Sequence, residues 1–147
     1  MTAIFEFTIM INGCGGIYNA CIANVGSAIY NGISKNNITD ADAVAETVEK
    51  IEAELGPIDR VANAAAIMPF GRLLEEDPGV TNRVMAVNYG GLVNLATAAL
   101  PRMVARGRGD FISFSSMTGI VPGLLMGAYA SSKAAVQFYS EILYHEN

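Results

Sequence analysis

The order of apolar and polar residues predicts that strands and helices alternate along this chain. Four short apolar runs, bounded by glycine, proline or polar residues, have the length of buried strands. They cover residues 3–11, 27–33, 58–62 and 111–114. Runs without strict alternation are typical of parallel strands that are covered on both faces. We therefore predict a three-layer α/β domain with about four parallel strands, ordered second, first, third, fourth by right-handed crossovers.

A first long helix is predicted after residue 39, because apolar residues recur there at three- and four-residue intervals and acidic residues occupy the opposite face. Thr39 and Asp42 match a capping box at its start, and Gly56 followed by Pro57 marks its end. The apolar face consists of Val44, Val48, Ile51 and Leu55.

A second helix is predicted to begin at Asp77 and Pro78, since aspartate is a favoured N-cap and proline a favoured first helical residue. It should bend or stop near Pro101. Its inward-facing residues are Val80, Val84, Val87, Leu92 and Leu95. The arginines near its end, which suit the negative end of the helix dipole, are Arg102, Arg106 and Arg108.

Composition and charge narrow the possible functions. With 147 residues and a net charge of −5, the chain is long enough for one domain with its own core. Its basic residues form no patch with interleaved aromatic residues, so we expect no nucleic-acid partner. Cys14 and Cys21 have no companion ligands at metal-binding spacing. We therefore expect no metal site, and two reduced thiols in a cytoplasmic protein.

The first 34 residues carry one charge, Glu6, which raises the question of a membrane segment or an export signal. The run lacks a basic start, and Glu6 together with several asparagines interrupts it. A buried strand, a glycine turn and a short helix explain the same composition. We therefore expect no membrane partner.

A glycine-rich turn, residues 12–16, follows the first predicted strand. Glycines there let a backbone approach a pyrophosphate, which the free N–H groups of a helix N-terminus can bind. Gly13 and Gly15 fit the first two places of the pattern G-x-G-x-x-G, but Tyr18 takes the third. Two interpretations remain open: a phosphate-binding turn that includes Gly16, and an ordinary glycine-rich turn.

The stretch 111–136 contains a predicted strand, a serine-containing loop and a helix with Tyr129 and Lys133. Residues four apart share one helix face, so the phenol and the ammonium can meet. A cation about 4 Å from a phenol, at an effective dielectric of about 20, contributes roughly 4 kcal/mol, or about three pKa units. We therefore expect Tyr129 to transfer protons near neutral pH, beside a serine hydroxyl. Taken alone, the pair also fits a packed tyrosine and a solvated lysine.

Three further features accompany this pair. Ser116 precedes Tyr129 by thirteen residues, Asn88 lies in the second helix, and Asn63-Ala64-Ala65-Ala66 follows a strand. From about residue 37 onward, this combination resembles the short-chain dehydrogenase/reductase family. The resemblance implies a Rossmann-like domain and an NAD(P)-dependent oxidoreductase that interconverts a small-molecule alcohol and a ketone by hydride transfer.

The resemblance also implies a role for each matching residue. Tyr129 would be the acid/base, and Lys133 would lower the pKa of Tyr129 and contact the ribose. Ser116 would hold the carbonyl oxygen, and Asn88 would anchor a proton-relay water. The expected contacts to NAD or NADP are Gly13, Gly15, Gly16, Asn37, Ile38, Asn63, Ala64, Ala65, Tyr129 and Lys133.

Relative to the family pattern, the chain looks shortened. Ala66 stands where the family has a glycine, and a strand–helix unit is absent between Gly13 and Asn37. The chain stops at Asn147, so we expect it to lack the family's segment that covers the nicotinamide. We therefore expect weak dinucleotide binding, and the choice between NAD and NADP is not readable because the second strand normally carries it.

Two other functions stay open. One is a shortened, catalytically inactive family member that acts only as a folding or dimerisation module. The other is an epimerase or dehydratase of the same fold, since relatives with those activities share Tyr-x-x-x-Lys. The family's dimers also imply that the chain forms a homo-oligomer through its helices around residues 80–99 and 128–144.

Overall fold

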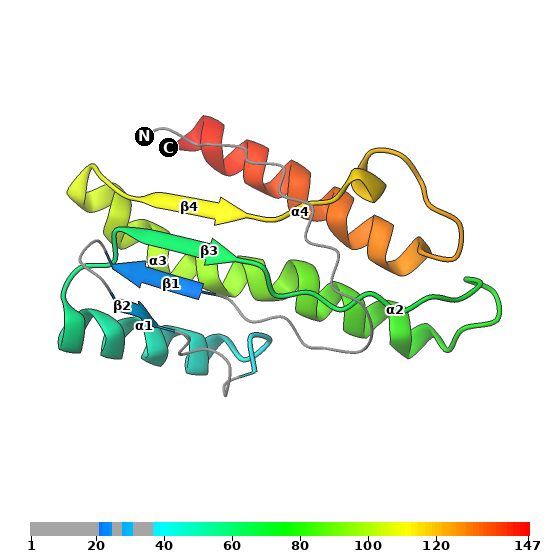
Figure 1. The fold of residues 1–147 in the computed structure, drawn as a ribbon, viewed down its shortest axis with the longest axis horizontal. Helices are drawn as coiled ribbons and strands as arrows, with labels where there is room; N and C mark the ends of the chain where they lie inside the picture. Colours follow the sequence, from blue (N-terminus) through cyan, green and yellow to red (C-terminus); the bar gives the residue numbers. More distant parts are fainter. Residues whose placement is uncertain (1–20, 25–27, 31–36) are drawn as a thin grey trace.

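The computed structural model of the chain describes residues 21–24, 28–30 and 37–147, which form a small sheet with helices packed against it (Figure 1). The continuous helix that contains α3 lies between α1 and α4, and it packs against both. The strands are β1 (Cys21–Asn24), β2 (Ala28–Tyr30), β3 (Arg60–Asn63) and β4 (Asp110–Ser113). The helices are α1 (Ala41–Leu55), α2 (Pro78–Met85), the π-helical turn η2 (Ala86–Gly90), α3 (Gly91–Arg106), the 3-10 turn η3 (Met117–Gly119) and α4 (Gly127–Glu146).

The four strands form one sheet in the order β2-β1-β3-β4. β3 and β4 are parallel, with Val61 opposite Phe111. β1 is antiparallel to both of its neighbours, so the prediction of four parallel strands is wrong for this part of the sheet. The link between β1 and β2 is only residues 25–27, and so short a connection can join only antiparallel strands.

The predicted order of strands in the sheet is observed, but the strand that comes first in the chain is a different one. β1 occupies the position expected of residues 3–11, which lie outside the described residues. β2 falls within the predicted strand 27–33, and β3 and β4 match the other two predictions to within two residues.

Helix α1 forms where its apolar pattern predicted it. Val44, Val48 and Ile51 are buried, whereas Leu55, the last helical residue, is 41% exposed and does not share their environment. The helix ends at Gly56, whose φ of 88° favours glycine. Together with residues of β3 and α3, this face forms the core.

The predicted capping box at the start of α1 is wrong. Asp40 is the N-cap, and its carboxylate accepts a hydrogen bond of 3.1 Å from the Ala43 N–H. The Thr39 hydroxyl instead donates to Asn37 Oδ1 at 2.8 Å. The cap therefore lies one residue later than predicted.

Segments α2, η2 and α3 form one continuous helix of 29 residues. Its start is confirmed, because Asp77 Oδ1 accepts a hydrogen bond from the Gly79 N–H at 2.6 Å and Pro78 begins the helix. Of the predicted bend or stop near Pro101, the stop is wrong: the exposed Pro101 is tolerated, and the helix continues to Arg106. Of its predicted inward-facing residues, three are fully buried and two partly buried: Val84, Leu92 and Leu95, then Val80 and Val87.

Within the described residues, this helix is also the one segment long and apolar enough to cross a membrane. The core helix of a soluble protein has the same length and composition. Here the helix packs against α1, α4 and the sheet, and 39% of its apolar window is buried inside the structure.

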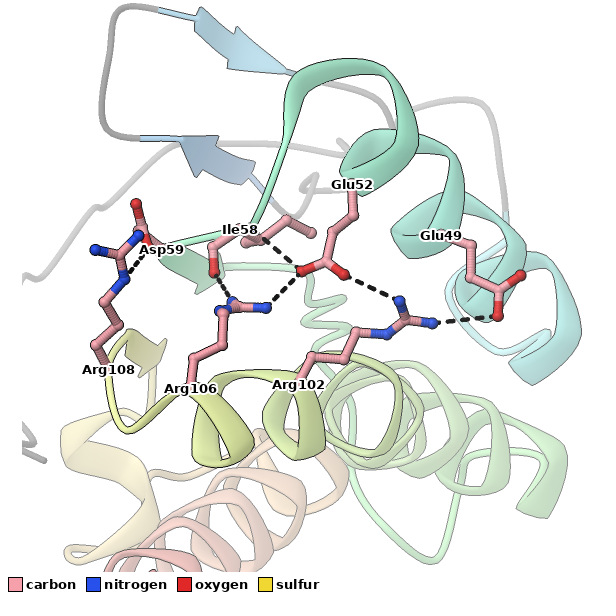
Figure 2. Close-up of polar contacts among 7 residues, drawn as sticks. All are labelled: Glu49, Glu52, Ile58, Asp59, Arg102, Arg106 and Arg108. Carbon is pink, nitrogen blue, oxygen red and sulfur yellow. Dashed lines mark hydrogen bonds and ion pairs between the residues drawn. The ribbon is translucent and has the colours of Figure 1, made fainter.

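Glu52 of α1 binds both arginines in the last turns of α3 (Figure 2). Its carboxylate accepts from Arg102 at 2.9 Å, from Arg106 at 3.0 Å and from the Ile58 N–H at 3.2 Å. Arg106 also donates to the Ile58 carbonyl at 2.6 Å. Arg102 reaches Glu49 at 3.2 Å.

These contacts give the arginines a role that the dipole argument missed. They join α1, α3 and the chain that enters β3 around one carboxylate. Burial acts to raise the pKa of Glu52, but the Ile58 N–H and the two guanidiniums outweigh it, so that the pKa of Glu52 is lowered. Arg108 forms a separate ion pair with Asp59 at 3.3 Å.

We predict that Glu52→Gln lowers the free energy of unfolding by about 2 kcal/mol at pH 7, because it keeps the shape but removes the charge that pairs two guanidiniums. Glu54→Gln is the matched control on the same helix, since Glu54 makes only an exposed pair with Lys50 at 3.9 Å. Urea unfolding of both variants measures the difference.

The stabilisation by Glu52 should also depend on pH. It is present above the ordinary carboxyl pKa of 4.5 and is lost as the pH falls through the lowered folded value. The difference between the wild type and Glu52→Gln should therefore shrink on acidification. Equal stabilities of the two Gln variants at pH 7 would contradict the role of Glu52.

Candidate active site

The loop after β4 and the first turns of α4 carry three predicted catalytic residues. Ser116 lies in the loop, and Tyr129 and Lys133 lie one turn apart in α4. The turn η3 packs against α4, and Gly119 has no room for a side chain there. An ideal Cβ on Gly119 would lie 2.9 Å from the Lys133 carbonyl carbon. This close approach holds the Ser116 loop against the turn that carries Lys133.

Lys133 is buried at the carboxyl end of β4, with 4% of its surface exposed. Its Nζ donates a hydrogen bond of 2.6 Å to the Phe114 carbonyl oxygen and lies 5.7 Å from the centroid of the Tyr129 ring. Among the described side chains, no carboxylate lies within ion-pair distance of this ammonium. Burial lowers the pKa of Lys133 to about 8, so that the cation is still the main form at pH 7.

The Ser116 hydroxyl caps η3. Its oxygen accepts hydrogen bonds from the Thr118 N–H at 3.2 Å and from the Thr118 hydroxyl at 2.9 Å. Neither bond uses the hydrogen of Ser116, because a hydroxyl is one donor and can accept twice. Ser116 is thus held as an acceptor and can donate to a substrate oxygen.

Asn88 lies in the π-helical turn η2 and is 1% exposed. Its Oδ1 accepts from the Ile67 N–H at 2.8 Å, and its Nδ2 donates to the Ile67 carbonyl at 3.0 Å and to Ser132 Oγ at 2.9 Å. Ser132 Oγ donates in turn to the Tyr129 carbonyl at 2.7 Å. The Asn88 amide therefore joins the loop after β3 to the first turns of α4.

Part of the predicted cofactor set lies beside these residues. Asn63 ends β3; its Oδ1 accepts from the Ala65 N–H at 3.2 Å, and its carbonyl accepts from the Phe114 N–H at 3.3 Å. Ala64 and Ala65 follow at the same edge of the sheet as Phe114. The parallel pairing of β3 and β4 thus places the Asn63 segment next to the strand end that binds Lys133.

A second part of the set lies before α1. Asn37 Oδ1 accepts from the N–H of Thr39 at 3.1 Å, and the carbonyl of the buried Ile38 accepts from Asn94 at 3.0 Å. The Asn37–Ile38 segment is therefore bound to α3 through Asn94, which lies six residues after Asn88 in the sequence. The predicted phosphate-binding residues Gly13, Gly15 and Gly16 lie outside the described residues.

The arrangement supplies groups for proton transfer to or from an oxygen atom. A phenol, a serine hydroxyl with an unused hydrogen and a buried ammonium belong to adjoining turns: Tyr129, Ser116 and Lys133. In the described part of the chain, no three His, Cys, Asp or Glu side chains come together as metal ligands.

Residues 19–147 match the family model of the short chain dehydrogenases. The chain belongs to this family. It is 39% identical over 109 residues to a short chain dehydrogenase of Pseudocercospora fijiensis, an alignment that covers 73% of this chain and 35% of that protein. It is 33% identical over 127 residues to the inactive 2-(S)-hydroxypropyl-CoM dehydrogenase 2 of Xanthobacter autotrophicus, with 86% of this chain and 54% of that protein covered.

Solved structures of short-chain dehydrogenases share the fold. A gluconate 5-dehydrogenase from Burkholderia cenocepacia, solved in complex with NADP and tartrate, superposes with a TM-score of 0.72 at 27% identity. The match covers 75% of this chain and 43% of that one. The predicted Rossmann-like α/β class is confirmed, and the chain spans between about a third and a half of the length of these relatives.

Sequence reasoning missed two serines that hold this candidate site together. Ser115 donates to the Lys133 carbonyl at 3.0 Å, and Ser132 links Asn88 to Tyr129. Their positions offered a signal, because Ser115 is adjacent to Ser116 and Ser132 is adjacent to Lys133.

We predict that Gly119→Ala lowers the free energy of unfolding by about 1–3 kcal/mol, because the new methyl would meet backbone atoms of Lys133 and Ala134 that cannot rotate away. Gly90→Ala is the control: Gly90 has a helical φ of −58°, and its nearest neighbour would lie 3.8 Å from the new Cβ. That variant should be unchanged or up to about 1 kcal/mol more stable. Urea unfolding distinguishes them, and equal behaviour would show that η3 can move away from α4.

Proposed function

We propose that this chain carries the catalytic residues of an NAD(P)-dependent oxidoreductase that interconverts an alcohol and a ketone by hydride transfer. The observation that supports it most is the buried Lys133 ammonium, fixed on the Phe114 carbonyl beside the Tyr129 ring. Membership of the short-chain dehydrogenase family supports the same reaction class.

The burial of Lys133 is costly for a purely structural role. The fall of its pKa from 10.5 to about 8 corresponds to about 3 kcal/mol of disfavoured charge. A packing role would be served as well by an uncharged side chain such as methionine. Strongly shifted pKa values are typical of sites where the charge is used in chemistry.

Each residue has a defined task in the proposed reaction. For reduction, the Tyr129 hydroxyl gives its proton to the carbonyl oxygen, while the Ser116 O–H donates a hydrogen bond to the same oxygen. The Lys133 cation stabilises the phenolate left on Tyr129. For oxidation the proton moves in the opposite direction, from the alcohol to Tyr129.

The residues present suit a nicotinamide cofactor, which when bound supplies or accepts the hydride. An ammonium has three N–H donors, and Phe114 is the acceptor of one of them. The other donors of Lys133 suit ribose hydroxyls. Asn63, Ala64 and Ala65 would line the same edge of the sheet, and Asn37 and Ile38 would lie near the adenine.

A catalytically inactive family member is the second candidate. It is favoured by the 33% identity to a relative that is itself named inactive. Ala66, which is buried where the family pattern has glycine, supports weak cofactor binding as well. Self-association, implied by the family resemblance, and a cytoplasmic location, expected from the two cysteines, stay predictions.

We predict that Tyr129→Phe lowers turnover of any accepted alcohol by roughly 10²-fold or more, because it removes the proton donor but keeps the ring. Turnover is followed by NADH or NADPH absorbance at millimolar cofactor. Cys14→Ser is the control and should retain normal turnover. The assignment would be wrong if Tyr129→Phe kept its activity and Cys14→Ser lost it.

We predict weak binding of NADH and NADPH by this chain, with dissociation constants near millimolar. Tyr18 in the third glycine place, Ala66, and the strand–helix unit absent between Gly13 and Asn37 each remove contacts or add crowding. At about 1–2 kcal/mol apiece they would together weaken a micromolar site by roughly 10²–10⁴-fold. Calorimetric titration with each cofactor measures this. Lys133→Met should abolish the remaining heat if Lys133 contacts the ribose, whereas a low micromolar constant for the wild type would overturn the prediction of weak binding.

A further inference from the structure

We propose that Ser132 is a positioning residue of this site: its hydroxyl ties the Asn88 side chain to the Tyr129 carbonyl and so fixes the turns of α4 that carry Tyr129 and Lys133. The expected effect on turnover rests on the proposed function. The positioning itself rests only on geometry, so the two can be tested separately.

The Ser132 hydroxyl both accepts and donates a hydrogen bond within the protein. It accepts from Asn88 Nδ2 at 2.9 Å and donates to the Tyr129 carbonyl at 2.7 Å. Ser132 has no exposed surface, so water does not compete for these bonds from the protein exterior. Loss of the hydroxyl would leave the Asn88 donor without this acceptor in a buried place.

The Asn88 side chain, to which Ser132 binds, is also held by contacts outside α4. Asn88 binds both the N–H and the carbonyl of Ile67, at 2.8 and 3.0 Å. Both hydrogens of its NH₂ group are therefore used, one on Ile67 and one on Ser132. The side chain of Asn88 thus links the loop after β3 to α4.

A serine inside a helix commonly bonds back to a carbonyl three or four residues earlier, and alone such a bond is local. Here Asn88 converts it into a link between separate segments. On the next residue, the Lys133 carbonyl accepts from Ser115 at 3.0 Å, and Gly119 packs against the same backbone. The turn that carries Lys133 is therefore held from two sides, by Ser132 and by Ser115.

The test compares Ser132→Ala with Ser131→Ala, an exposed serine on the same turn. The first readout is the kinetic constants with any alcohol that the full chain oxidises. Because Ser132 is not expected to touch the substrate, Ser132→Ala should lower kcat about tenfold and leave KM within about twofold. Ser131→Ala should change neither.

The second readout needs no activity. The side-chain carbon signals of Lys133 are followed by NMR from pH 6 to 11 in the folded protein. The wild type should titrate near 8. In Ser132→Ala the looser turn lets the ammonium reach water, and the midpoint should rise by about half a unit or more. A residue with a merely structural role would lower the unfolding midpoint without moving this titration.

The outcomes separate the two hypotheses. A raised Lys133 midpoint in a chain without turnover would support the positioning role and reject the proposed function. An unchanged midpoint and unchanged kcat in folded Ser132→Ala would overturn the positioning role. If Ser132→Ala does not fold, Ser132→Cys, which has a similar size but a weaker donor and acceptor, takes its place with the same criteria.

A double variant supplies the last check. If Ser132 and Asn88 act as one unit, Asn88→Ala combined with Ser132→Ala should shift the Lys133 midpoint no further than Asn88→Ala alone. Additive shifts would show that Ser132 acts on Lys133 without Asn88, and would overturn the proposed tie.

Discussion

The hydrogen bond from the Lys133 ammonium to the Phe114 carbonyl joins the end of β4 to α4 across a buried site. A charged group in such a place requires a fixed acceptor, and a backbone carbonyl at a strand end is one that cannot rotate away. The neighbouring contacts follow from it. Gly119 lets the loop lie against the same turn, and Ser115 secures the Lys133 carbonyl.

Much of the helical structure could be predicted from the sequence because its signals are local. Asp77 with Pro78 marked a helix start, and the spacing of Val44, Val48 and Ile51 identified a buried face. The directions of the first two strands could not be predicted from their apolar composition, since the same residues suit parallel and antiparallel pairing. Pro101 was misleading because the helix continues past it to Arg106, although proline lacks the N–H that a helix interior uses.

The candidate site also has a part that could be predicted from local sequence and a part that could not. The placement of Ser116, Tyr129 and Lys133 on neighbouring turns could be predicted, because their spacing along one strand, loop and helix carries the signal. The link from Ile67 through Asn88 to Ser132 joins residues 21 and 44 positions apart, and the glutamate that pairs with two arginines of α3 lies 50 or more positions before them. Interactions of this kind have no period in the sequence, so they appear only when the helices are packed.

The π-helical turn around Asn88 has a consequence for how this chain can change. A π turn holds one residue more than an α-helical turn, and such turns are often found at functional sites. Deleting one residue from a regular helical stretch would rotate one flank relative to the other by about 100°. Within Ala86–Gly90 the same deletion would replace the π turn by a regular turn and leave α2 and α3 nearly in phase, so that α2 still faces α4. Single-residue deletions that spare Asn88 should therefore be tolerated better in this turn than elsewhere in the same helix.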